Sequence, residues 1–195
     1  RSFDSTFFQA PGRMNIYDEH PFKVILDYAH NPAAVRAMCN LVDRFEVKGR
    51  KLVVLAAPGD RRDEDIQEIA RLAAGHFDHF ICRADDNRRN RGPDEVARIL
   101  QAQLIECGVK PEQIEVVPDE QMATQHALSI AASDDLILVL ADQIKRTWKQ
   151  IIYFDSSADK TSGTETKAST IALPDVDLFT FDEDVQIISD ERGVR

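Results

Sequence analysis

The sequence has little cysteine, no long apolar run and no excess of positive charge, and each deficit excludes a class of protein. Three of its 195 residues are cysteine, without a Cys-x-x-Cys pair, which argues against a disulfide framework. We therefore expect buried free thiols at Cys39, Cys82 and Cys107 and a cytoplasmic location. No apolar run approaches the roughly 20 residues of a membrane helix. A net charge of −10 argues against binding to nucleic acid or to an anionic membrane.

Motifs for phosphate and metal binding are also missing. The sequence contains no Gly-x-x-x-x-Gly-Lys-Ser/Thr and no Gly-x-Gly-x-x-Gly, so a bound nucleotide would receive most of its phosphate contacts from elsewhere. His76 and His79 have no partner at metal-ligand spacing, and we expect no metal site in this chain.

Apolar runs instead alternate with segments of helical periodicity, and 43% of the residues are hydrophobic. Strands that are apolar throughout and joined by helices indicate a parallel sheet covered on both faces. The sequence thus predicts a Rossmann-like, three-layer α/β domain with a mostly parallel sheet of five or six strands. The expected strands begin at Lys23, Lys51, Phe80, Ile114 and Leu136, and the expected helices at Pro32, Glu64, Asp94, Glu120 and Ile144.

The chain divides into three parts by composition. Residues 1–22 are expected to be a lead-in linker from a preceding domain, and residues 23–154 the α/β domain. Residues 155–195 carry ten acidic and four basic residues and form an acidic, partly mobile extension. Within it, 178–181 and 185–189 are expected to be strands that dock on the domain or on a second copy, so homo-oligomerisation through the extension is one expectation.

The most informative segment follows the first expected strand. Asp27, Tyr28 and His30 come where the run Lys23–Leu26 ends, and Asn31-Pro32 opens a helix. Ligands of open α/β sheets bind outside the carboxyl ends of the strands, which suggests a nucleotide or substrate site. The alternative is that Asp27 and Asn31 only cap the helix.

Two charged loops follow the next expected strands. In the loop 57–63, glycine permits close approach of a ligand, and Arg61 or Arg62 could hold a carboxylate or phosphate. In the loop 83–92, acids and arginines would suit a zwitterionic or guanidinium-bearing ligand. The alternatives are a tight turn with Asp63 as a helix cap, and solvated surface ion pairs.

Together these segments resemble the carboxy-terminal domain of the Mur ligase superfamily, and most of all its cyanophycin synthetases. The resemblance runs from about residue 11 to residue 154. It rests on Pro11-Gly12-Arg13-Met14-Asn15, Leu26-Asp27-Tyr28-Ala29-His30-Asn31-Pro32, Pro58-Gly59-Asp60-Arg61-Arg62-Asp63 and the acidic-then-basic loop Asp85-Asp86-Asn87-Arg88-Arg89-Asn90-Arg91.

The resemblance implies an ATP-dependent amide ligase, in which a carboxylate is phosphorylated and an amine attacks the acyl phosphate. ATP and Mg²⁺ would be held mainly by a central domain that is not in this chain, and this domain would close as a lid. Arg13 would contact the phosphates, Asp27 the ribose hydroxyls, and Tyr28, His30 and Asn31 the nucleotide, with Arg13 and His30 as candidate catalytic residues. The incoming amino acid, arginine by the resemblance, would meet Asp60, Arg61, Arg62, Asp85, Asp86, Arg88 and Arg89.

Three other functions remain open from the sequence. The chain could be the lid of another Mur-type ligase that acts on muropeptides or polyglutamate. It could also be a non-catalytic Rossmann-like interaction domain, or a receiver domain, although only Asp27 of the acidic pair that a receiver needs is present. Because it lacks a phosphate loop, the isolated chain is expected not to turn over ATP.

Overall fold

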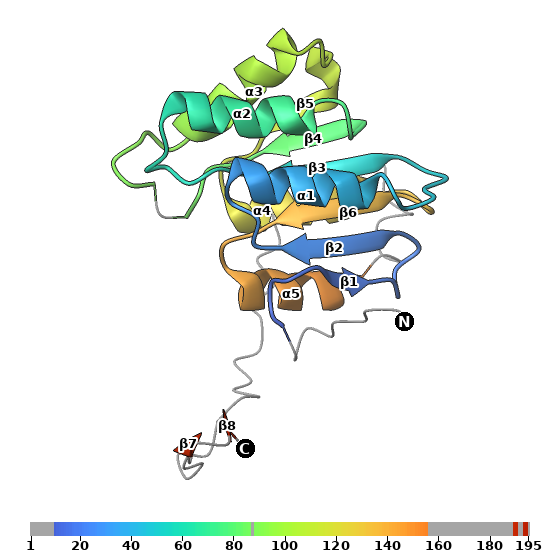
Figure 1. Cartoon of the computed structure of the whole chain (residues 1–195). Coiled ribbons are helices and arrows are strands. Elements are labelled where there is room, and N and C mark those ends of the chain that lie inside the picture. The colour runs from blue at the N-terminus through green and yellow to red at the C-terminus, as the bar shows by residue number, and fades with distance from the viewer. Residues whose placement is uncertain (1–9, 87, 156–188, 191–192, 195) are drawn as a thin grey trace. The chain divides into compact units, whose positions relative to one another are not determined.

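The computed structural model describes residues 10–86, 88–155, 189–190 and 193–194. A six-stranded sheet of order β1-β2-β6-β3-β4-β5 forms its centre, in which β1 pairs with β2 antiparallel and all other pairs are parallel (Figure 1). The strands are β1 (Asn15–Tyr17), β2 (Lys23–Asp27), β3 (Lys51–Leu55), β4 (His79–Cys82), β5 (Ile114–Val116) and β6 (Leu136–Leu140). The helices are α1 (Pro32–Val42), α2 (Asp63–Ala73), α3 (Glu95–Glu106), α4 (Glu120–Ile130) and α5 (Ile144–Ile152), with a 3₁₀ turn at Pro111–Gln113.

Helices cover both faces of the sheet, as the apolar strands predict. One core contains Ile25, Val53 and Leu138 with the buried residues of α1, α2 and α3. Of these helices, α1 and α2 lie in front of the strands in Figure 1. The second contains the alternate strand residues, such as Val54 and Val139, with α4 and α5. Successive side chains of a strand point to opposite faces, so each apolar strand supplies both cores. The expected three-layer fold is confirmed.

Two helix starts depend on the side chain of the residue before them, and the sequence indicated one of these caps, Asn31. Asn31 Oδ1 accepts a hydrogen bond from the Ala34 amide at 3.0 Å, and Asp119 Oδ1 accepts one from the Met122 amide at 2.8 Å. These bonds satisfy amides that have no partner within the helix. Asp63, by contrast, is the first residue of α2 rather than its cap.

Two features differ from the sequence expectations. Residues Asn15–Tyr17, expected in a linker, form the edge strand β1. Cys107 is exposed, because it follows the last residue of α3, whereas Cys39 and Cys82 are buried as expected. Burial raises the pKa of the Cys39 thiol to about 11 and raises that of Cys82 further.

The second compact unit, 162–195, is described only at β7 (Ser189–Asp190) and β8 (Gly193–Val194), which pair antiparallel. Apart from Ser189, the strands expected at 178–181 and 185–189 lie outside the described residues. No helix in the described part of the chain is long and apolar enough to cross a membrane.

Candidate functional site

The parallel strands β2, β6, β3, β4 and β5 all end at one edge of the sheet, here called the carboxyl edge. Asp27 is the last residue of β2, while Asp60 lies in the loop after β3 and Asp85 in the loop after β4. The parallel pairings therefore bring these three acids, far apart in sequence, to the same edge. The order of the strands places Asp27 two strands away from Asp60 and three strands away from Asp85.

Asp27 joins the segment before β1 to the end of β2. Its Oδ2 accepts a hydrogen bond from the Met14 amide at 2.8 Å, and its Oδ1 accepts one from the Ala29 amide at 2.8 Å. The Tyr28 amide donates to the Gly12 carbonyl at 2.9 Å. Asp27 is thus not a helix cap. It fixes the turn that carries Arg13 beside the end of β2, and the residue as a whole is 9% exposed.

Tyr28 and His30 form an aromatic pair beside Asp27. Their ring centroids lie 4.7 Å apart, and 41% of Tyr28 is exposed. His30 Nδ1 lies 2.9 Å from the Tyr28 carbonyl oxygen. Because a carbonyl can only accept a hydrogen bond, Nδ1 carries the hydrogen, and Nε2 of the neutral ring is then an acceptor.

The two charged loops are joined to each other. Arg89 Nη1 lies 2.7 Å from Asp60 Oδ2, so these two predicted substrate-binding side chains form an ion pair. Arg62 pairs with Asp65 of α2 at 3.1 Å. Arg61 and Arg88 are exposed. The loops therefore contain surface ion pairs, as the alternative interpretation expects, and they also bring their charges to one surface.

A buried ionic network under these loops was not identified from the sequence. Arg83 and Glu120, both 0% exposed at the side chain, pair at 2.9 Å, and Arg83 also pairs with Asp142 at 3.2 Å. Arg146 of α5 lies 3.1 Å from Glu120 and 2.8 Å from Asp86. The available signal in the sequence was Arg83, a single arginine directly after an apolar strand. Because an unpaired charge there would be costly, such an arginine indicates a buried acidic partner.

The network controls the charge of Asp142. Burial alone would raise the pKa of this carboxyl group, but a hydrogen bond from Asp85 and the nearby Arg83 guanidinium outweigh burial and lower the pKa. The Asp86 amide also donates to Asp142 Oδ2 at 3.3 Å. Acids of the loop after β4 are thereby connected to the residue that follows β6.

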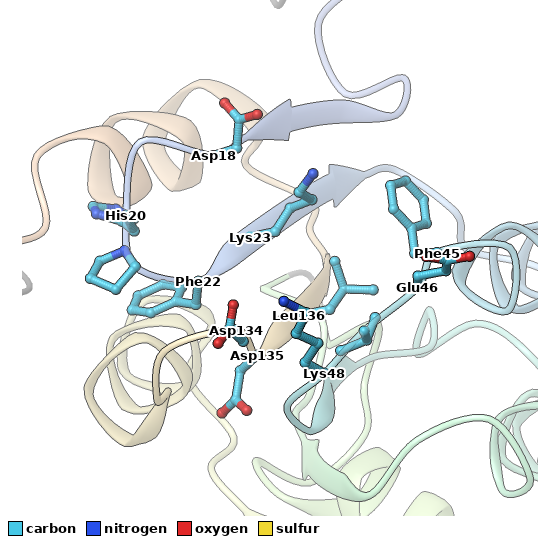
Figure 2. Close-up of a pocket in the computed structure, with 12 residues that line it drawn as sticks. Asp18, His20, Phe22, Lys23, Phe45, Glu46, Lys48, Asp134, Asp135 and Leu136 are labelled. Atoms are coloured by element: carbon cyan, nitrogen blue, oxygen red, sulfur yellow. The ribbon is translucent and has the colours of Figure 1, made fainter.

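The opposite edge of the sheet, where β2 and β6 begin, contains a cavity of 370 Å³. Figure 2 shows Lys23, Lys48, Asp134 and Leu136 among its lining side chains, and Lys23 Nζ lies 5.7 Å from the centroid of the Phe45 ring. None of the site residues predicted from the sequence lines this cavity. Within the described ranges, no group of three or more His, Cys, Asp or Glu residues could hold a metal ion.

Similarity to known proteins identifies the family of this chain. A family model for the Mur ligase, glutamate ligase domain, matches residues 12–142. The chain belongs to this family. The match covers the sheet and ends just before α5.

Relatives of this Mur ligase domain include longer proteins. It is 34% identical over 152 residues to the cyanophycin synthetase of Nostoc sp., which covers 77% of this chain and 16% of the relative. It is also 34% identical over 140 residues to the UDP-N-acetylmuramoyl-L-alanyl-D-glutamate–2,6-diaminopimelate ligase of Caldanaerobacter subterraneus, covering 69% of this chain and 27% of that protein. The chain thus spans less than a third of the length of either relative.

Solved structures agree on the fold. A UDP-N-acetylmuramoyl-L-alanyl-D-glutamate–2,6-diaminopimelate ligase superposes with a TM-score of 0.58 at 19% identity, over 73% of this chain and 32% of that chain. E. coli FolC in complex with DHPP and ADP superposes with a TM-score of 0.55 at 25% identity, over 73% of this chain and 31% of that chain. The same domain fold therefore occurs within larger proteins.

Proposed function

We propose that this chain is the carboxy-terminal domain of an ATP-dependent amide ligase of the cyanophycin synthetase type, and that it closes over ATP and binds the incoming amino acid. The observation that carries the proposal is the arrangement along the carboxyl edge. The Arg13 turn is fixed to Asp27 at the end of β2, and the two charged loops lie farther along the same edge. Similarity to cyanophycin synthetases over 77% of the chain supports the same assignment.

The Asp27 end of the edge suits a nucleotide. Each carboxylate oxygen of Asp27 accepts one amide hydrogen bond, and because such an oxygen has two lone pairs, each retains an acceptor position for a ribose hydroxyl. Arg13, exposed in the adjoining turn, would provide positive charge for the phosphates. ATP supplies the phosphoryl group that activates the acceptor carboxylate, and Mg²⁺ would be held by another domain.

The loop end of the edge suits a zwitterionic amino acid. Exposed arginines at 61 and 88 would bind its α-carboxylate. Asp86, beside its ion pair with Arg146, and Asp85, beside its hydrogen bond with Asp142, would offer carboxyl oxygens to a cationic side chain. Arginine carries such a side chain, as a planar guanidinium that carboxylates bind with two hydrogen bonds. Arginine is therefore our proposed incoming substrate.

In the proposed reaction, the amine of this amino acid attacks the acyl phosphate carbonyl. The new C–N bond forms as the C–O bond to phosphate breaks, phosphate leaves, and the amine loses a proton. The contribution of this domain would be to bind and orient the amine and to exclude water, because both reactants must be held in contact for efficient transfer.

A second candidate is a ligase that transfers diaminopimelate or glutamate. The 34% identity to a diaminopimelate ligase favours this alternative, since that substrate also has carboxylate and ammonium groups. The candidates differ in the side chain of the incoming amino acid, which is a guanidinium in arginine, an ammonium with a carboxylate in diaminopimelate and a carboxylate in glutamate.

The test uses the complete polypeptide that contains this chain, with ATP, Mg²⁺ and an acceptor with an aspartate backbone. Amide formation with arginine, diaminopimelate and glutamate is followed by ADP release and product mass. We expect arginine to give the highest kcat/KM. Absence of an amide product with all three amino acids would refute the ligase assignment, and a preference for either other amino acid would refute arginine.

The nucleotide contact has its own test. Wild-type enzyme should use 2′-deoxy-ATP less efficiently than ATP by a factor of about 10 or more. The reason is that the analogue lacks a hydroxyl that would form a hydrogen bond with a charged group, the Asp27 carboxylate. Asp27→Asn should weaken ATP use and reduce that discrimination, whereas the matched change Asp18→Asn, exposed at the other edge, should leave both unchanged. The 195-residue chain alone should show no ATP turnover above a protein-free control.

A further inference from the structure

Arg91 joins the two charged loops of the carboxyl edge. Its Nε donates to the Gly59 carbonyl at 2.9 Å, and its Nη2 donates to the Arg61 carbonyl at 2.7 Å. The same Nη2 lies 2.7 Å from Asp63 Oδ1 at the start of α2. One guanidinium from the loop after β4 therefore contacts three residues of the loop and helix start after β3.

The other side of the guanidinium is tied to its own loop. Arg91 Nη1 lies 2.8 Å from Glu95 Oε1, and Glu95 Oε2 accepts a hydrogen bond from the Gly92 amide at 2.8 Å. Glu95 is the first residue of α3, so Arg91 is held by a helix while it holds the neighbouring loop. All three nitrogens of the side chain are engaged, and the side chain is only 17% exposed.

The backbones of the two loops also lie close together at Gly59. Gly59 has no side chain, and a Cβ there would collide with the Arg88 carbonyl. Arg89 and Asn90, between that carbonyl and Arg91, have φ values of 49° and 72°, a left-handed conformation that is uncommon for residues other than glycine. Such a turn persists only where surrounding contacts determine it, and the guanidinium of Arg91 provides several of them.

We propose that Arg91 is a positioning residue for the incoming amino acid: it sets the spacing and orientation of the loop that carries Asp60, Arg61 and Arg62 relative to the loop that carries Arg88 and Arg89. The inference rests on the proposed function, in which side chains of both loops bind one amino acid. Arg91 acts through the two loops, since each of its three side-chain nitrogens already contacts a protein acceptor.

The chemistry of the side chain makes the proposal testable. A guanidinium offers donors in a fixed planar fork, which can reach the Gly59 and Arg61 carbonyls and two carboxylates at once. Lysine keeps the charge but presents a single ammonium, so Arg91→Lys would lose most of these contacts. A shift of about 1 Å in groups that orient a substrate can reduce its use by about 100-fold.

Kinetics of the complete polypeptide with Arg91→Lys and Arg91→Ala provide the test. We expect KM for the amino acid to rise about 10- to 100-fold in both variants. The KM for ATP should stay within about twofold, because β2, which ends at Asp27, lies two strands from β3 and three strands from β4. The matched control is Arg98→Lys on α3, where the arginine is 65% exposed and pairs only with Asp94 among the described residues.

A structural readout on the 195-residue chain separates positioning from general destabilisation. Amide hydrogen exchange in residues 59–62 and 88–92 should accelerate in Arg91→Lys, with exchange in β2, β3 and β6 unchanged. If Arg91→Ala does not fold, Arg91→Lys still decides the question.

Three results would overturn the positioning role: an unchanged KM for the amino acid in Arg91→Lys, an equal rise in both KM values, or loss of thermal stability with unaltered kinetics. Failure of the proposed function gives a different result, since the wild-type enzyme itself would then form no amide with any amino acid, and the positioning role would fail with it.

Discussion

Replacement of Glu120 by glutamine would remove the central negative charge of the buried network and is expected to destabilise the domain strongly. The Glu120 carboxylate is 0% exposed and pairs with Arg83 and Arg146. It also accepts hydrogen bonds from the Asp142 amide at 2.7 Å and from Thr147 Oγ1 at 2.7 Å. It therefore joins the starts of α4 and α5 to the end of β4.

The expected cost follows from the partner that would remain. Arg83, also fully buried, would retain Asp142 as an acidic partner but lose Glu120, and breaking a buried ion pair on one side costs about 3–5 kcal/mol. The amide of glutamine would also place donor hydrogens against donors of its neighbours. We expect the free energy of unfolding of Glu120→Gln to fall by about 3 kcal/mol or more.

Urea unfolding of the 195-residue chain, followed by fluorescence of its single tryptophan, measures this loss. Trp148 is a suitable probe because it lies on α5 and packs against the second core. The matched control Glu106→Gln, exposed at the end of α3, should change stability by no more than about 0.5 kcal/mol. A loss below about 1 kcal/mol for Glu120→Gln, with an unchanged denaturant slope, would show that the network does not stabilise the fold in this way.

Two further predictions concern other titratable groups. Burial opposes ionisation of Glu115, but hydrogen bonds from His126 and His79, each at 2.7 Å, outweigh it and lower its pKa. The stability that this carboxylate provides should be complete above the ordinary glutamate pKa of about 4.3 and be lost as the pH falls through the lowered folded-state value. Glu115→Gln should thus flatten the acid side of the stability profile from urea titrations between about pH 3 and 6, and an unaltered profile would contradict the assignment. In a thiol titration with an aromatic disulfide, Cys107 should react at once and the two buried cysteines only after unfolding; rapid reaction of all three would refute the burial pattern.

The layered fold could be predicted because its signals are local. Apolar runs such as 136–140 and helix caps such as Asn31 and Asp119 act within a few residues of their position. The edge strand β1 was missed because its three residues have no strand pattern of their own and depend on pairing with β2. Exposure of Cys107 likewise depends on where α3 ends against the rest of the fold.

The candidate site was only partly predictable for the same reason. Sequence places Asp27, Asp60 and Asp85 after successive strands, and parallel pairing then brings them to one edge. Pairing between Arg83 and Glu120 joins residues that are far apart in the chain and share no motif. Long-range ion pairs of this kind depend on packing, which a spacing pattern does not encode.

The acceptors that Arg91 uses at Gly59 and Arg61 have a consequence for how the edge can change. Both are main-chain carbonyl oxygens, which every amino acid supplies. The side chain at position 61 can therefore be exchanged without removing the bond that holds its loop, while position 59 has no room for one. The backbone geometry of the two loops thus depends on different groups from the side chains that the loops expose. Under the proposed function, the exposed side chains could change to suit another amino acid while this geometry is conserved.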